Sequence, residues 1–467
     1  MNFRTKQYLR KRFGDYYKNT GLAMPPQLTK REWGFIFFDE LPEVVMRRHK
    51  AFSGESDALE YIRGMVPAHA YHSAAYYRFP GASTMKEKQW QGADLIFDLD
   101  ADHLPQKPRS YAEMLSNVKA ETLKLLDFLH EDFGFSENNI SIAFSGGRGY
   151  HIHVRDPRVL SLESPERREI VDYLSGTGLS VDFLFKPAKY LKVDTGKFWK
   201  KELQSPRKVS SFEDEVSKGF GWGKRITQYL IHFLKDISTK DDTDAINEIL
   251  DIIKSFRVRT AHSDTVSSDI TEQIIQMKND NRKVSEIAEE FGYPEDKVKN
   301  ILIANGLLDF KREATSKLKL LKKIAQSQKA LDMIQNGNID FPDATYIFDA
   351  IIDKAVQDNS INLGGGHTDE PVTADVKRLI RMPSSLHGGS GMRVVSLTFA
   401  GLQKFEPLND AVVFSEKETK VEVLSPLKPQ NSKVEMKGKS FTVTEGINTL
   451  PEYAAMYLMC RGAAEYA

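Results

Sequence analysis

Alternating and helically spaced apolar positions divide the chain into stretches that favour strands and stretches that favour helices. Apolar residues at every second position predict a half-buried strand, and recurrence every three to four residues predicts an amphipathic helix. The predicted helices cover residues 2–17, 43–52, 57–65 and 111–130, and the predicted strands cover residues 93–99, 140–144 and 150–154. The last two strands flank a glycine-rich turn and form a predicted hairpin.

The pattern changes in the second half of the chain. Residues 194–358 are charged, mostly helical in spacing and poor in strand signals, which indicates a helical insert. Strand-like sequence resumes near Val372 and continues through 391–398 and 420–424, followed by a predicted loop over 426–437 and a closing helix over 451–461. Two strand-rich parts around a helical insert predict one site assembled from distant segments.

Composition narrows the function classes without naming one. The formal net charge is zero, so a polyanionic partner would have to bind to local clusters of basic residues. Cys460 is the only cysteine, which excludes an intrachain disulfide and a cysteine-rich zinc knuckle. No apolar run is long enough to span a bilayer, and the basic N-terminus lacks the apolar stretch of a secretory signal. We therefore expect a cytoplasmic protein.

The sequence GADLIFDLDAD contains the first candidate for chemistry. Strand alternation sends Asp98 and Asp100 to the same face. Two carboxylates this close repel each other unless a cation lies between them. Oxygen ligands suit Mg²⁺ or Mn²⁺, which neutralise charge on phosphate groups during nucleotidyl transfer. An acidic, solvated strand edge is the alternative interpretation.

The turn SGGRGYHIHV contains the second candidate. Its glycines permit positive φ angles and close backbone approach, and Arg148 offers a planar fork for phosphate oxygens. Ser145 ends the preceding strand, while His151 and His153 share a face of the following one. The two histidines have no third ligand nearby at a spacing that suits zinc. A tight hairpin turn with an exposed arginine is the alternative.

The third candidate lies far downstream, in HTDEPVTADVKRLIRMPSSLHGGSGMRV. This segment offers two carboxylates, Asp369 and Asp375, followed by Arg381 and then by His387 before another glycine turn. Taken with the D-L-D strand and the S-G-G-R-G-Y-H turn, it resembles the small catalytic subunit of archaeal and eukaryotic DNA primase. The resemblance covers residues 25–160 and 365–400, with three motifs in the family's order.

The resemblance implies an α+β fold: a primase-polymerase (prim-pol) catalytic core of mixed β-sheets flanked by helices, with a mostly helical insertion. Residues 1–193 would form the first part of the core, 194–358 the insertion, and 359–467 the second part with a C-terminal extension. Three aspartates would bind two Mg²⁺ or Mn²⁺ ions. By motif these are Asp98, Asp100 and Asp369, with Asp375 as the rival for the third place.

The resemblance also assigns nucleotide-binding residues. Those implied to contact the triphosphate or to lie near the nucleotide are Ser145, Arg148, His151, Arg381, His387, Glu32 and Arg48. The stretch after the D-L-D strand departs from the family, since it contains His103 but no cysteine. We therefore expect no zinc. Residues 283–308 have the apolar spacing of a helix-turn-helix. We interpret them either as a structural pair of helices or as a segment that makes weak phosphate contacts.

The implied function is de novo synthesis of short primers on single-stranded DNA for replication, with NTPs or dNTPs as substrates and a primase large subunit as partner in a heterodimer. The protein would then be cytoplasmic and associated with the nucleoid. One alternative keeps the same catalytic core but assigns it to repair or end joining. Another is a non-enzymatic helix-turn-helix protein with an acidic metal site, which leaves the triphosphate-binding residues unexplained.

Overall fold

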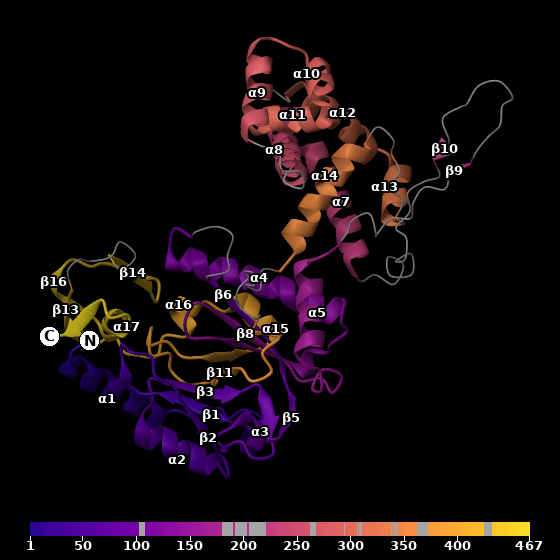
Figure 1. Cartoon of the computed structure of the whole chain (residues 1–467). Helices are drawn as coiled ribbons and strands as arrows, with labels where there is room; N and C mark the ends of the chain where they lie inside the picture. Colours follow the sequence, from indigo (N-terminus) through magenta and orange to yellow (C-terminus); the bar gives the residue numbers. More distant parts are fainter. Residues whose placement is uncertain are drawn as a thin grey trace, which may run out of the picture. The chain divides into compact units, whose positions relative to one another are not determined.

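The helical middle of the chain folds as a unit of its own, and the segments on either side of it fold together. In the computed structural model, one unit comprises Met1–Thr177 and Ile361–Ala467, and the other comprises Gly178–Ser360 (Figure 1). The structure describes residues 1–101, 108–179, 190–191, 203–204, 221–261, 268–293, 295–305, 307, 311–337, 339, 341, 344–361, 372–424 and 432–467.

The discontinuous unit combines strands from both ends of the chain with helices. Its helices are α1 (Phe3–Asn19), α2 (Glu55–Met65), α3 (Met85–Lys88), α4 (Tyr111–Glu131), α5 (Ser164–Ser175), α15 (Phe399–Lys404), α16 (Pro407–Asp410) and α17 (Glu452–Cys460). Its strands are β1 (Trp33–Ile36), β2 (Arg47–Lys50), β3 (His69–Ser73), β4 (Ala75–Tyr77), β5 (Trp90–Ala93), β6 (Leu95–Asp100), β7 (Ile140–Phe144), β8 (Gly149–Val154), β11 (Leu379–Arg381), β12 (Val395–Leu397), β13 (Glu418–Val423), β14 (Lys433–Met436), β15 (Lys439–Thr442), β16 (Gly446–Pro451) and β17 (Ala464–Tyr466). This mixture confirms the predicted α+β class.

Two four-stranded sheets organise this unit. One has the order β11-β3-β1-β2 and the other β12-β7-β8-β6. The C-terminal part of the chain completes both, since β11 pairs antiparallel with β3 and β12 pairs antiparallel with β7. Ile96 of the second sheet packs with Ala74 and Ile380 in one buried cluster, so the face of β6 that carries the aspartates turns toward the first sheet.

Helix α4 covers the opposite face of the second sheet, where it packs on β6 and β8. Ser110 caps its first turn by accepting a hydrogen bond from the backbone N–H of Glu113 at 3.1 Å. Apolar residues recur along one side, and Leu125 and Leu129 are fully buried. The predicted helix over 111–130 is therefore confirmed, and it presses the apolar side of β6 into the core.

Two local predictions were wrong. The helix predicted over 43–52 is replaced by strand β2, which pairs antiparallel with β1 at the edge of its sheet. Pairing with β1 satisfies backbone N–H and C=O groups that would otherwise bond within a helix. Val44 and Val45, which precede the strand, are exposed. The loop predicted over 426–437 contains strand β14, which forms a hairpin with β15.

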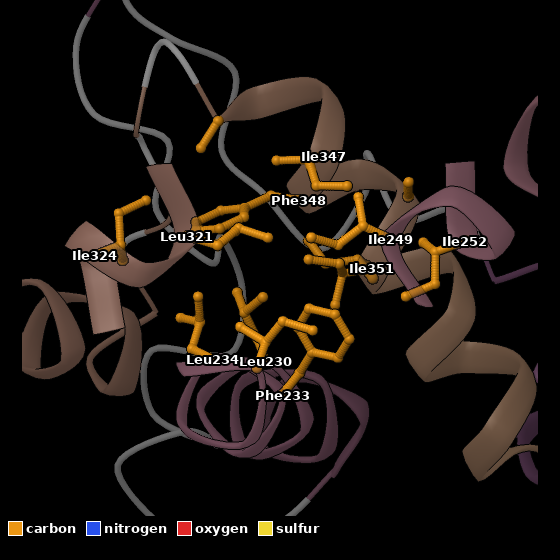
Figure 2. Packing of buried hydrophobic residues seen from close by; sticks show 14 of the residues in the cluster. Leu230, Phe233, Leu234, Ile249, Ile252, Leu321, Ile324, Ile347, Phe348 and Ile351 are labelled. Atoms are coloured by element: carbon orange, nitrogen blue, oxygen red, sulfur yellow. The ribbon is translucent and has the colours of Figure 1, made fainter. Parts of the chain in front are cut away.

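The second unit is mostly helical in its described part. It contains the short strands β9 (Tyr190–Leu191) and β10 (Leu203–Gln204) and the helices α7 (Gly221–Thr239), α8 (Asp242–Ala261), α9 (Ser268–Asn279), α10 (Val284–Phe291), α11 (Glu295–Ala304), α12 (Lys311–Ala325), α13 (Gln328–Gln335) and α14 (Thr345–Asn359). Figure 2 shows its main core, where Leu230 and Phe233 of α7 meet Ile249 of α8, Leu321 of α12 and Phe348 of α14.

A smaller core holds the segment with helix-turn-helix rhythm. Ile287 of α10 and Val298 of α11 pack with Ile274 of α9. Gly292 ends α10 with φ of 63°, a left-handed conformation that suits glycine at a helix C-terminus. The pair is thus packed against a third helix, α9. Across the described part of the chain, no helix is long and apolar enough to cross a bilayer.

Candidate active site

The carboxylates of Asp98 and Asp100 line a cavity of about 800 Å³ in the discontinuous unit. Both lie on β6, where Asp98 is opposite His151 and Asp100 is opposite Gly149 of β8. Their side chains are 22% and 34% exposed, whereas Leu99 between them is buried. Residues of both four-stranded sheets line the cavity, so it opens between them.

The glycine turn between β7 and β8 is held by Ser145. Its hydroxyl accepts hydrogen bonds from the backbone N–H groups of Gly147 and Gly149, each at 3.3 Å. Those two amides are therefore hydrogen-bonded within the turn. Arg148 projects from the turn with its Nε 3.5 Å from Asp100 Oδ1, and both residues line the cavity.

The glycines of this turn allow very close packing. A Cβ on Gly149 would lie 1.8 Å from the carbonyl oxygen of Leu99, so only glycine lets β8 approach β6 beside Asp100. A Cβ on Gly147 would lie 2.9 Å from Nε2 of His387, which places that imidazole edge against the turn. The glycine turn thus contacts both the strand that carries Asp98 and Asp100 and the downstream segment that carries His387.

Two histidines of the cavity are neutral. His151 is buried with its Nε2 3.4 Å from Asp98 Oδ1, and burial lowers its pKa to about 4 despite the opposing effect of the Asp98 charge. Burial, together with the positive charge of Arg381, also lowers the pKa of His387 well below its ordinary value. Nδ1 of His387 accepts a hydrogen bond from the backbone N–H of Gly389 at 3.2 Å. The proton of neutral His387 therefore lies on Nε2.

Arg381 reaches the cavity from β11. Its Nη1 donates to Nδ1 of His69 at 2.6 Å, and its guanidinium lies 5.0 Å from the centre of the Tyr71 ring. The backbone N–H of Gly388 also donates to Nδ1 of His69, at 3.3 Å. Burial lowers the pKa of His69 well below its ordinary value, so this ring acts as a neutral acceptor. His69 thereby ties Arg381 to the turn that follows His387.

Arg48 lines the cavity, whereas Glu32 lies behind it. The Glu32 carboxylate is fully buried and accepts hydrogen bonds from Arg48 Nε at 3.0 Å and from the backbone N–H of His49 at 3.1 Å. Lys88, also fully buried, places its Nζ 3.6 Å from the same carboxylate. Burial raises the pKa of Glu32, but the hydrogen bond and charge of Arg48 outweigh it, and the net shift is downward. Glu32 therefore orients Arg48 as a charged partner.

The two candidates for a third aspartate have different outcomes. Asp369 lies outside the residues that the structure describes, as does His103. Asp375 lines the cavity, and its Oδ1 accepts a hydrogen bond from the backbone N–H of Lys377 at 2.9 Å. The choice between Asp369 and Asp375 as a metal ligand stays a prediction.

Arg378, one of the two arginines of VKRLIR in the third segment, places its Nη2 4.0 Å from Asp98 Oδ2. Other cavity residues were not singled out from the sequence. Lys377 lies beside Arg378, and the neighbouring basic residues in VKRLIR were a signal for it. Tyr111 and Arg461 also line the cavity, but they come from the start of α4 and the end of α17, and no local motif marks them.

The donor set suits a hard divalent cation. Within the described ranges, no group of three or more His, Cys, Asp or Glu side chains has a metal-binding arrangement. The two carboxylates of Asp98 and Asp100 nevertheless share one strand face at a polar cavity. Mg²⁺ is commonly bound through one or two carboxylates, with water and substrate phosphates completing its coordination. Such an ion therefore fits this pair, and the neighbouring cations fit the phosphates.

Comparisons with known proteins point to one family. Residues 97–399 match the family described as DNA primase small subunit. Proteins named DNA primase small subunit PriS are similar over the full length of both chains: the one from Methanococcoides burtonii is 41% identical over 466 residues, and the one from Methanocella arvoryzae is 43% identical over 468 residues. The one from Halobacterium salinarum is 36% identical over 472 residues, again with complete coverage.

Proposed function

Because the chain belongs to the DNA primase small subunit family, which implies a nucleotidyltransferase-type enzyme, we propose that it is the catalytic subunit that synthesises primers de novo on single-stranded DNA. The observation that carries this proposal is the cavity itself. It gathers the carboxylate pair of β6, the turn before β8 and Arg381 of β11 from segments about 280 residues apart in sequence.

The reaction joins a 3′-hydroxyl to the α-phosphorus of an incoming nucleoside triphosphate and releases pyrophosphate. Asp98, Asp100 and Asp369 would hold two Mg²⁺ or Mn²⁺ ions, which when bound neutralise phosphate charge and lower the pKa of the attacking hydroxyl. The protein's own contribution is to fix the triphosphate and to offset the charge that gathers on the leaving pyrophosphate.

Residues around the carboxylate pair would bind the triphosphate. Arg148 and Arg381 carry positive charge, and the second is held in place by His69. His387 is a neutral donor through Nε2, because burial lowers its pKa well below the ordinary value. The Ser145 oxygen already accepts two backbone N–H groups, which leaves its own proton to donate to a phosphate oxygen.

The remaining site residues would act less directly. Neutral His151 has a single ring N–H, and this donor would face the triphosphate beside Asp98. Arg48 would contact the nucleotide, with Glu32 as the buried carboxylate that orients it. We further propose that the chain works in the nucleoid as a heterodimer with a primase large subunit, as the name of its relatives as small subunits suggests.

The decisive test is unprimed synthesis on single-stranded DNA by the full chain, alone and with the large subunit, with NTPs and dNTPs supplied separately. Asp98→Asn should reduce synthesis on the order of 10³-fold, because loss of a metal ligand removes several kcal/mol of charge stabilisation. Asp244→Asn, an exposed aspartate on α8, is the matched control.

Two results would contradict the proposal. Full activity of Asp98→Asn would remove the carboxylate pair from the chemistry. Efficient extension of a supplied primer without initiation, even with the large subunit present, would assign the same cavity to repair or end-joining synthesis.

A further inference from the structure

A second cavity of about 450 Å³ adjoins the active-site cavity. It lies between the start of α4, the β14 strand and the end of α17. Tyr111, Arg148 and Arg461 line both cavities, so the two spaces lie side by side. None of the nucleotide-binding residues assigned above lines this second space except Arg148.

The interior of the second cavity is apolar and aromatic. Met114, Val434 and Met436 are buried side chains that line it. The rings of Tyr111 and Tyr457 stand with their centres 5.9 Å apart and their planes 48° apart. Tyrosine and methionine offer the polarisable surface on which a nucleobase packs, and every base has a face that can use it. The interior therefore suits a flat, weakly polar ring.

The rim carries mostly positive charge. Among the described residues, Arg109, Arg148, Lys433 and Arg461 line the space together with a single carboxylate, that of Glu435, which forms an ion pair with Lys433. The Arg461 guanidinium lies 5.2 Å from the ring centre of Tyr457 and 5.9 Å from that of Tyr111, so cation and aromatic surface form one continuous wall. Alternating cationic and aromatic surface is the pattern that binds single-stranded nucleic acid.

We infer that this second cavity binds the single-stranded DNA template, with a base against Tyr111 and Tyr457 and the flanking phosphates at Arg109 and Lys433. The inference rests on the proposed function, because it assigns a strand to the space next to the reacting nucleotide. An incoming triphosphate is the poorer occupant: the carboxylate pair, Arg381 and His387 all line the first cavity and not the second.

The affinity of the full chain for a fluorescein-labelled oligothymidylate, measured by anisotropy at several salt concentrations, tests this. The double variant Arg109→Ala/Lys433→Ala removes two phosphate contacts and spares every residue of the first cavity. Each contact contributes about 0.7 to the salt slope for a single strand, so the slope should fall by about 1.4 and the affinity by roughly 25-fold at 0.1 M salt. Binding of a fluorescent ATP analogue with Mg²⁺ should not change.

Lys439→Ala is the matched control. Lys439 lies on the same β14–β15 hairpin and is also ion-paired, its Nζ being 3.1 Å from Glu416 Oε1, but it does not line the cavity. This variant should bind the oligonucleotide like the wild type. Equal affinity and equal salt slope for the double variant and the control would overturn the inference, and so would a loss of nucleotide binding as large as the loss of DNA binding.

Photocrosslinking with 4-thiothymidine at single positions of the oligonucleotide gives a readout independent of activity. Crosslinks should map to the peptides that contain Met436 and Tyr457. Crosslinks that map only elsewhere would refute the assignment. Failure of this inference can be told apart from failure of the proposed function. If the template binds elsewhere, the double variant should still carry out unprimed synthesis. If the proposed function is wrong, the wild type itself should show no unprimed synthesis.

Discussion

The close approach of β8 to β6 should be essential for activity, and Gly149→Ala tests this with a single methyl group. The Cβ of alanine would lie 1.8 Å from the Leu99 carbonyl oxygen and 3.0 Å from the Cα of Asp100. Ordinary van der Waals contact begins at 3.4 Å, so the two strands must separate by about 1.6 Å where they meet. The obstacle is backbone on both sides, and no flexible side chain can move aside.

That displacement falls on the strand that carries both active-site carboxylates. Misplacing a reacting group by about 1 Å can cost on the order of 100-fold in rate, so we expect kcat for primer synthesis to fall at least that far. Overpacking of this kind also costs about 1–3 kcal/mol of stability, which should appear as a lowered melting temperature without loss of secondary structure. Steady-state primer synthesis and thermal melts followed by circular dichroism measure the two effects.

Gly64→Ala is the matched control, because it makes the same chemical change at an exposed position of α2 where no atom lies within 4 Å of the new Cβ. It should leave kcat and the melting temperature unchanged or slightly improved. If Gly149→Ala matched this control in both measurements, the contact between Gly149 and Leu99 would not be what positions the aspartates.

Two further predictions concern buried carboxylates. Asp94→Asn should destabilise the fold by about 3–5 kcal/mol in urea denaturation, because the fully buried Asp94 carboxylate binds two arginine side chains that would lose their counter-charge. Burial raises the pKa of Asp94, but a hydrogen bond from a histidine and the two arginine charges hold it well below its ordinary value. This stabilisation is complete above the unfolded pKa of about 4 and is lost as the pH falls further. The difference in free energy of unfolding between wild type and variant should therefore shrink only below about pH 4. A difference that shrinks already at about pH 6 would contradict this role of Asp94. Glu32→Gln should raise KM for the nucleotide about tenfold and change kcat less, because a charge-assisted hydrogen bond to Arg48 is worth about 1.5–3 kcal/mol; a fall in kcat at constant KM would instead place Glu32 in the chemistry.

Local sequence determined the elements that carry the candidate chemistry. Alternation along β6 assigned Asp98 and Asp100 to one face, and the structure places both at the cavity. The three glycines of the turn after β7 predicted close backbone approach, and the structure shows it at Gly149, where an added Cβ would lie 1.8 Å from the Leu99 carbonyl oxygen. These features depend on the two-residue repeat of a strand and on the missing Cβ of glycine, and both are properties of a few consecutive residues.

Predictions from the local apolar pattern were wrong where hydrogen bonding between separate segments decides the secondary structure. Residues 43–52 have helical spacing but supply the edge strand β2, because β1 offers them backbone partners. Likewise, no spacing rule relates Arg381 to His69, or Tyr111 to Tyr457, since these residues meet only after α4, β3, β11 and α17 have packed.

The sequence by itself determined which residue types are available for metal and phosphate, and in which strands and turns they lie. Only the tertiary structure decided that Glu32 is buried behind Arg48, that His387 is neutral with its proton on Nε2, and that a second basic and aromatic cavity opens beside the first. The reason is physical: burial, charge balance and cavity shape depend on what surrounds a side chain in space, and those surroundings include residues from other strands and helices.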